Sequence, residues 1–375
     1  MSQDQEYLRD ELQLIARRKL MRRFGVAGAA AVAAPLGFLG FSTRPTDDIC
    51  RTNPSARSIF DVFGSSAYAA DKPAIATAPP KSIKLAWNAT APCLAPVALA
   101  LQEGIFTKHN LNVELINFGG STEQLLEAIA TRKADAGVGM ALRWLKPLEQ
   151  GFDVKLTGGT HGGCLRLVSS KASGLTDLAQ LRGKTIGVSD MASPAKNFFA
   201  IMLAKRGIDP VKDVEWRQFP PDLLKIALQK GEAQAIADGD PRLFLSTKDK
   251  NLVEIATNLS GEYKNRACCV IGIRGSLIRE DKPTARALTQ ALLEAQMRTS
   301  MHPEAAAKAF AQFAKATPEE VTAMLQSHTH GHNPVGSDFK TELRLYAEEL
   351  KLVSVLKPST DPSKFAERVY ANVLS

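Results

Sequence analysis

The chain has 375 residues, of which 45% are hydrophobic and 23% charged, with 26 Gly, 20 Pro and 5 Cys. This composition is globular and excludes a disordered chain, a collagen and a disulfide-dense miniprotein, while the length predicts two domains. The formal net charge is +8, but the basic residues are scattered with little aromatic interleaving, so nucleic acid is not expected as a partner.

The N-terminal segment has the pattern of an export signal. Arg17 and Arg18, followed by apolar residues and further bases, resemble a twin-arginine (Tat) signal. The stretch 24–41 is rich in Ala and Gly, which suits a signal peptide better than a membrane anchor. An A-x-A cleavage pattern stands at 67–69, farther downstream than usual, so earlier cleavage or a retained anchor stays an alternative. We expect a periplasmic protein in which 1–69 is signal and spacer.

Strands and helices alternate through the rest of the chain. The expected strands are 82–88, 112–118, 135–141, 154–157, 165–169, 185–189, 214–219, 235–238 and 267–273, with a glycine turn at 158–163. The expected helices are 95–109, 122–133, 175–181, 190–206, 221–230, 283–301, 305–313, 318–326, 339–350 and 362–373. This alternation predicts an α/β protein with parallel sheets.

The order of the elements predicts two lobes joined by a hinge. One lobe would comprise 80–170 together with 268–375, and the other would be an insertion at 171–267. Two passages of the chain between the lobes would leave a central cleft, and ligands of such sheets bind beyond the carboxyl ends of the strands.

Candidate ligand contacts are the residues that directly follow the expected strands. They are Asn88, Thr90, Cys93, Gly120, Ser121, Met140, Thr160, His161, Cys164, Asp190, Ser193, Asp238 and Asp240. Backbone N–H groups at the helix starts after Gly120 and Asp190 would bind an oxyanion. For each residue taken singly, the alternative is an ordinary turn or helix cap.

Three stretches resemble a known family. LQEGIFTKHNLNVEL at 101–115, LTDLAQLRGKTIGV at 175–188 and ALQKGEAQAIADGDP at 227–241 are similar to solute-binding subunits of ABC importers, in the nitrate/sulfonate/taurine-type branch of the type II periplasmic binding proteins. The resemblance covers about 80–375. It implies a two-lobed type II fold, a small and anionic solute, a membrane permease as partner, a monomer, no cofactor and no catalysis. It leaves nitrate, bicarbonate, alkyl sulfonates, taurine and pyrimidines open as solutes.

The cysteines are unusual for an exported protein. Cys93, Cys164 and the pair Cys268–Cys269 all fall where the chain is expected to approach the cleft. Buried packing is the plain interpretation, and a thiol-lined site for a soft metal or thiophilic ligand is the alternative. We predict that at least two of Cys93, His161, Cys164 and Cys268 form one cluster in the cleft.

Histidines leave two further hypotheses open. His328, His330 and His332 alternate, so an extended chain would present three imidazoles on one side, although a solvated loop is the simpler interpretation. His161 with Cys268–Cys269 also resembles, faintly, the thiamine-pyrimidine synthases that share this fold. The alternatives to solute capture are therefore such an enzyme, or a periplasmic module that binds a metal or thiophilic ligand.

Overall fold

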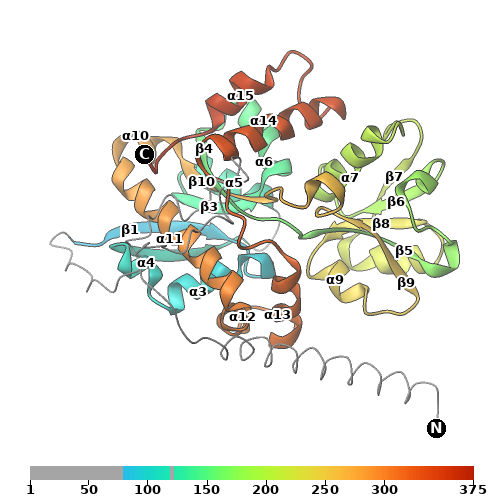
Figure 1. Cartoon of the computed structure of the whole chain (residues 1–375), viewed down its shortest axis with the longest axis horizontal. Coiled ribbons are helices and arrows are strands. Elements are labelled where there is room, and N and C mark those ends of the chain that lie inside the picture. The colour runs from blue at the N-terminus through green and yellow to red at the C-terminus, as the bar shows by residue number, and fades with distance from the viewer. Residues whose placement is uncertain (1–78, 119–121) are drawn as a thin grey trace, which may run out of the picture. The chain divides into compact units, whose positions relative to one another are not determined.

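The computed structural model of the protein describes residues 79–118 and 122–375. The predicted export signal and its cleavage pattern lie outside these residues, as do Gly120 and Ser121. Within the described ranges, ten strands form two five-stranded sheets, each flanked by helices (Figure 1). The two mixed α/β sheets form the two lobes that the sequence predicted.

In each sheet four strands run in one direction and one strand runs opposite to them. The first sheet has the order β2-β1-β3-β10-β4, formed by β1 (Lys81–Trp87), β2 (Leu111–Asn117), β3 (Ala136–Met140), β4 (Val154–His161) and β10 (Cys269–Arg274). The second has the order β7-β6-β8-β5-β9, formed by β5 (Leu165–Ser170), β6 (Thr185–Val188), β7 (Glu215–Gln218), β8 (Ala235–Gly239) and β9 (Leu252–Thr257).

The expectation of purely parallel sheets is wrong at one strand of each sheet. Strand β10 runs antiparallel to β3 and β4, and β5 runs antiparallel to β8 and β9. The reason lies in the connections. A parallel neighbour needs a crossover of a dozen residues or more, whereas β4 leads into β5 and β9 into β10 by short segments that pass to the other sheet.

These passages place β5 in the second sheet, although the expected first lobe extended to residue 170. The chain crosses first at 162–164, and returns between the end of β9 and the start of β10. As a division into domains, the boundaries near 170 and 267 stay a prediction.

Helices cover both sheets. They are α3 (Ala95–Gln102), α4 (Ile105–Lys108), α5 (Thr122–Ala130), α6 (Ala141–Glu149), α7 (Pro194–Lys205), α8 (Leu224–Gln229), α9 (Arg242–Ser246), α10 (Gly275–Glu280), α11 (Lys282–Met301), α12 (Pro303–Phe310), α13 (Pro318–Ser327), α14 (Gly336–Leu352) and α15 (Pro362–Val369). The expected helix 95–109 is interrupted at Gly104, which has a left-handed φ of 70°. Among the described residues, none of the helices combines the length and apolar character that a membrane crossing needs.

The expected glycine turn at 158–163 is wrong, because β4 continues through His161 and pairs with β10. Gly159 serves close packing there. A Cβ on it would lie 2.7 Å from the Cβ of Ala267 and 2.8 Å from the ring of Pro334. The absent side chains let the segment at Pro334 approach, and its carbonyl accepts a hydrogen bond of 2.9 Å from the Gly159 N–H.

One apolar core includes residues from both sheets. It contains Leu85 and Ile271 of the first sheet and Leu167 and Ile186 of the second, all fully buried. A smaller cluster around Val168 packs against the helices of the second sheet. Burial of this kind is the dominant favourable contribution to folding.

Candidate functional site

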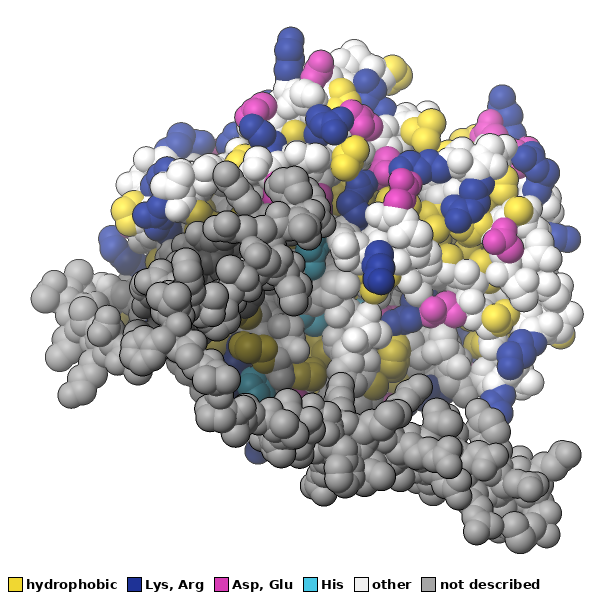
Figure 2. Space-filling model, viewed as in Figure 1, with side chains coloured by type: hydrophobic (Ala, Val, Ile, Leu, Met, Phe, Trp, Pro, Cys, Tyr) yellow, Lys and Arg dark blue, Asp and Glu magenta, His cyan; other side chains and the backbone are white. Residues whose placement is uncertain are grey.

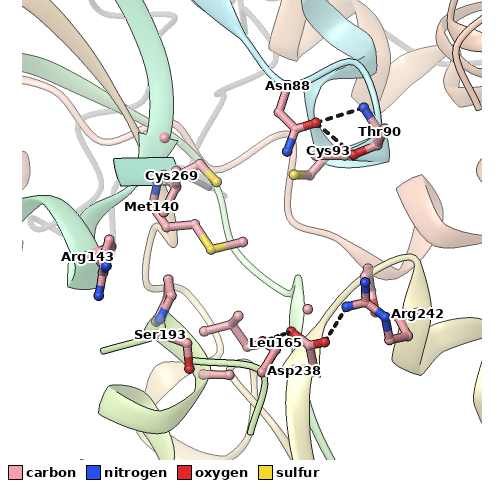
Figure 3. A pocket seen from close by; sticks show the side chains of 18 of the residues that line it. Asn88, Thr90, Cys93, Met140, Arg143, Leu165, Ser193, Asp238, Arg242 and Cys269 are labelled. Atoms are coloured by element: carbon pink, nitrogen blue, oxygen red, sulfur yellow. Dashed lines mark hydrogen bonds and ion pairs between the residues drawn. The ribbon is translucent and has the colours of Figure 1, made fainter. Parts of the chain in front are cut away.

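A pocket of about 340 Å³ lies where both sheets present the carboxyl ends of their strands. Asn88 follows β1, Met140 ends β3, Ser189 follows β6 and Asp238 stands near the end of β8, and all four line the pocket. Figure 3 shows Asn88, Met140 and Asp238 around it. Open α/β sheets bind ligands at this position. The pocket therefore occupies the place that the sequence predicted for the cleft.

Most of the predicted contacts line this pocket. They are Asn88, Thr90, Cys93, Met140, Asp190, Ser193, Asp238 and Asp240. Thr160, His161 and Cys164 do not belong to its lining, and each has no exposed surface. The physical reason is that Thr160 and His161 lie inside strand β4 instead of in a turn.

Other lining residues were not predicted, and the most notable are Arg143, Arg242 and Cys269. The two arginines stand in the first turns of α6 and α9, two helices that the sequence analysis did not anticipate. Both arginines could have been predicted as pocket residues from the sequence, because each stands a few residues after the end of an expected strand. Of the pair Cys268–Cys269, it is Cys269 that lines the pocket.

Arg143 connects the two lobes beside the pocket. Its guanidinium projects from α6 of the first lobe, donates to Glu123, and lies 3.3 Å from a carboxylate oxygen of Asp190 in the second. It also donates a hydrogen bond of 2.6 Å to the carbonyl of Ala192. A second contact runs alongside, in which the Asn197 amide donates to the carbonyl of Leu142 at 3.1 Å. A cation is thus held where the lobes meet.

Asp238 provides a second charged pair on the pocket wall. Its carboxylate accepts hydrogen bonds from Arg242 and, at 3.2 Å, from the Ser189 hydroxyl (Figure 3). Burial raises the pKa of Asp238, although Arg242 acts in the opposite direction. The raised pKa means that the ionised carboxylate is costly to keep in this wall.

Asp240 lines the same pocket, but its carboxylate contacts buried side chains of the protein. Arg166 donates to both of its oxygens, at 2.7 Å and 3.1 Å, and a ring nitrogen of His328 lies 3.0 Å away. All three side chains are almost fully buried. Because these partners already satisfy the carboxylate, Asp240 holds the wall in place and is not available to a cation in the pocket.

The polar residues at the strand ends also organise the local backbone. The Asn88 side-chain oxygen accepts hydrogen bonds from the N–H and hydroxyl of Thr90, and its amide nitrogen lies on the pocket side (Figure 3). Ser193 caps α7 by accepting from the N–H of Lys196 at 3.2 Å. The capping alternative is therefore correct for Ser193, which lines the pocket at the same time.

Four buried cysteines gather behind one side of the pocket. The Sγ atoms of Cys93, Cys164 and Cys269 all lie within 4.8 Å of one another, and Cys164 Sγ is 3.2 Å from Cys268 Sγ. Cys93 and Cys164 thus share a cluster, as the sequence predicted, but of these two only Cys93 lines the pocket and Cys164 lies buried behind it. The placement of the cluster in the cleft itself stays a prediction. Hydrogen bonds from the Cys164 and Cys269 thiols lower the pKa of Cys268 to about 6, and the donor Cys164 has its pKa raised to about 11.

Histidines form a separate buried cluster. The ring of His161 stacks on His328, with centroids 5.4 Å apart, and lies 4.9 Å from the ring of His330. His330 also contacts the Gln296 amide oxygen at 2.6 Å. Burial, together with the neighbouring His161 and His328, lowers the pKa of His330 well below its usual value.

This cluster corrects the solvated-loop interpretation of 328–332. His328 and His330 are buried, so the loop is an internal packing element. His332 departs from the expected row of three imidazoles. Its ring nitrogen lies 3.4 Å from Glu342, and its side chain is 41% exposed.

Comparison with known proteins shows which family has this sequence and fold. The model of the NMT1-like family matches residues 76–315, which is more than half of the chain. The nitrate import ATP-binding protein NrtC of Synechococcus elongatus is 27% identical over 239 residues, covering 59% of this chain and 36% of that protein. The chain thus spans about a third of the length of the curated relatives it matches.

Solved structures share the fold at low sequence identity. The periplasmic aliphatic sulphonate binding protein SsuA from Escherichia coli is 14% identical with a TM-score of 0.66, covering 78% of this chain and 93% of that one. The periplasmic nitrate-binding protein NrtA from Synechocystis is 14% identical with a TM-score of 0.64, covering 79% and 87%. These structures confirm the type II periplasmic binding protein fold, and the family match shows that this chain belongs to the NMT1-like family.

Proposed function

We propose that the protein is the extracytoplasmic solute-binding subunit of an ABC importer and captures a small organic anion in its interlobe pocket. The observation that carries this proposal is the pocket itself, lined from both sheets at the carboxyl ends of their strands. A non-catalytic binding role follows from the fold by analogy with the sulphonate- and nitrate-binding proteins. In this scheme the lobes close on the solute, and a membrane permease recognises the closed form.

The pocket favours a solute with both a charge and an apolar part. Its volume of about 340 Å³ is in the range of small-ligand sites. The side chains of Leu94, Leu125, Val138 and Leu165 contribute apolar surface, while Arg143 supplies a planar guanidinium suited to an oxyanion. An alkylsulfonate uses both features, whereas nitrate would leave the apolar surface unoccupied.

Arg143 is the residue that we expect to contact the anion. Its present partners include Asp190, whose side chain is 44% exposed and loses little when water replaces the arginine. An incoming sulfonate would take that place while the contact to the Ala192 carbonyl keeps the guanidinium oriented. This exchange would couple solute binding to the contact between the lobes.

The enzyme alternative has weaker support. It depended on His161 acting together with Cys268–Cys269, and His161 is buried outside the pocket lining. Its Nδ1 lies 3.3 Å from the carbonyl of Gly162, and its ring packs on two other histidines. We therefore favour solute capture over a thiamine-pyrimidine-synthase-like reaction.

A panel of ligands tests the proposal by thermal unfolding. The panel contains nitrate, bicarbonate, taurine, short alkanesulfonates and a thiamine-precursor pyrimidine. A ligand present at 100 times its dissociation constant adds about 2.7 kcal/mol to the free energy of unfolding. We expect the alkanesulfonates to raise the Tm most, and a shift confined to the pyrimidine would contradict the assignment.

Export is the second part of the proposal. We infer that the protein passes to the periplasm by the Tat pathway, is cleaved near residue 70 and acts there as a monomer. Fractionation of cells that express the full chain tests this directly. Replacing Arg17 and Arg18 together by Lys should retain the precursor in the cytoplasm, whereas processed periplasmic protein from that variant would overturn the Tat assignment.

A further inference from the structure

Three thiols from distant parts of the sequence converge at the inner side of the pocket. Cys93 stands in the 3-10 turn at Pro92–Leu94, Cys164 precedes β5, and Cys269 begins β10. Their sulfur atoms lie within 4.8 Å of one another, and each residue is at most 3% exposed. Hydrophobic packing alone does not require sulfur at three facing positions contributed by three separate segments.

We propose that Cys93, Cys164 and Cys269 form a site for a soft metal ion of the Cu(I) type. This site goes beyond solute capture and does not depend on which solute the pocket takes. With metal–sulfur bonds of about 2.3 Å, three ligands around one ion place their sulfurs about 4 Å apart. The observed separations need a contraction of less than about 1 Å, which side-chain rotation supplies.

The set of donor atoms selects the kind of ion. Three thiols and no histidine or carboxylate make up this group, and soft thiolate ligands select Cu(I) over hard cations such as Mg²⁺ or Ca²⁺. Cys268 is left out because the three sulfur atoms that all lie within 4.8 Å of one another are those of Cys93, Cys164 and Cys269, and Cys268 contacts this group from outside, with its sulfur 3.2 Å from that of Cys164. A structural Zn²⁺ usually has four protein ligands, so a three-thiol group suits Cu(I) better.

The pocket supplies an entry path to this site. Cys93 and Cys269 belong to the pocket lining, and Figure 3 shows their sulfur atoms directed toward one another. Met140 is the register partner of Cys269 on strand β3 and places its thioether in the same pocket. A thioether is a further soft donor that would receive Cu(I) on its way to the thiols.

Titration of the reduced, metal-free full-length protein with Cu(I), in competition with the chelator bicinchoninate, tests the proposal. We expect one Cu(I) per chain. Each of Cys93→Ser, Cys164→Ser and Cys269→Ser should weaken binding by at least about tenfold, because even loss of an outer-shell partner costs that much. Cys50→Ser is the matched control, since it removes the one cysteine of the sequence outside the group of four, and it should bind like the wild type.

Two measurements keep the test independent of folding defects and of solute capture. The X-ray absorption spectrum of the Cu(I)-loaded wild type should show sulfur ligands alone, at about 2.3 Å. Alkanesulfonate binding, measured on the same samples, reports on the proposed function separately. The site is refuted if the wild type fails to compete for Cu(I), if all three variants retain it, or if nitrogen or oxygen ligands dominate the spectrum. A disulfide between two of the three residues in the protein as isolated would also overturn it.

Discussion

Arg143 on α6 and Asp190 after β6 lie 3.3 Å apart, and this ion pair joins the two lobes at the edge of the pocket. The arginine is 13% exposed and the aspartate 44%, so the cation is the more firmly held partner. Because Arg143 contacts both lobes, a solute that binds to its guanidinium would affect the contact between them.

The first prediction concerns Arg143→Ala. A hydrogen bond to a charged group contributes about 1.5–3 kcal/mol, so the variant should bind alkanesulfonate about 10- to 100-fold more weakly. Isothermal titration calorimetry measures the change. Arg344→Ala is the control, because within residues 79–118 and 122–375 the only ion pair of Arg344 is with Glu348, one turn along α14, and its loss should leave affinity unchanged. Equal affinity of the two variants would remove Arg143 from the site.

The second prediction is a pH dependence at Asp238. Burial raises the pKa of this carboxyl in the folded state, so the unfolded chain releases the proton first as pH rises. The wild type therefore loses stability from the unfolded pKa up to the folded pKa. Asp238→Asn removes this loss, and its free energy of unfolding relative to the wild type should increase from pH 4 to pH 7 in urea titrations.

Asp153 provides a control for that experiment, because its pKa is shifted in the opposite direction and the change of stability with pH should have the opposite sign. The hydrogen bond from Arg279 lowers the pKa of Asp153, so Asp153→Asn should lose stability relative to the wild type as the pH rises from the folded pKa to the ordinary aspartate pKa, and stay level above it. The urea titrations of both variants therefore extend below pH 4. Parallel pH profiles for the two variants would show that burial does not govern Asp238.

The third prediction concerns Gly139→Ala. A Cβ at this position would lie 2.1 Å from the indole of Trp144 and 2.8 Å from the hydroxyl of Thr122. The tryptophan is fully buried, so the clash should cost about 1–3 kcal/mol in chemical unfolding. Gly331→Ala is the matched control, because its nearest neighbours are 3.6 Å away. A wild-type midpoint for Gly139→Ala would contradict the packing described.

The fourth prediction concerns the buried pair of Asp240 and Arg166. Asp240→Ala strips Arg166 and His328 of a shared partner inside the protein. Removing one member of a buried ion pair costs about 3–5 kcal/mol. Glu348→Ala removes an exposed pair and should cost less than about 1 kcal/mol. Thermal and urea unfolding compare the two, and similar values would contradict the structural role of Asp240.

The fold and the residues at the strand ends could be predicted from the sequence, because both depend on local patterns. Strand ends, caps and turns are local signals, so Asn88, Met140 and Asp238 could be placed from their own neighbourhoods. The same local reasoning failed at Gly158 and Gly159, where two glycines indicated a turn. These positions lack a side chain because the segment at Pro334, distant in the chain, packs closely against them. A contact between distant segments leaves no sign in the local sequence pattern.

Long-range relationships were likewise out of reach. The contact of His161 with His328 joins β4 to a loop more than 160 residues later, and its only sequence sign was an alternation that also fits a solvated loop. Arg143 was missed because helix α6, in which it stands, was not predicted at all. The cysteine cluster was foreseen only because thiols are rare and therefore conspicuous.

The two passages between the sheets run in contact with each other. A Cβ on Gly162 in the first passage would lie 2.4 Å from the carbonyl oxygen of Arg266 in the second, and the Cys268 N–H donates to the carbonyl of His161 at 2.6 Å. We expect paired segments of this kind to act as a two-strand ribbon that bends more easily than it twists. Rotation of one lobe about the long axis of the other would shear these contacts, so we expect opening and closing of the pocket to be the easier motion.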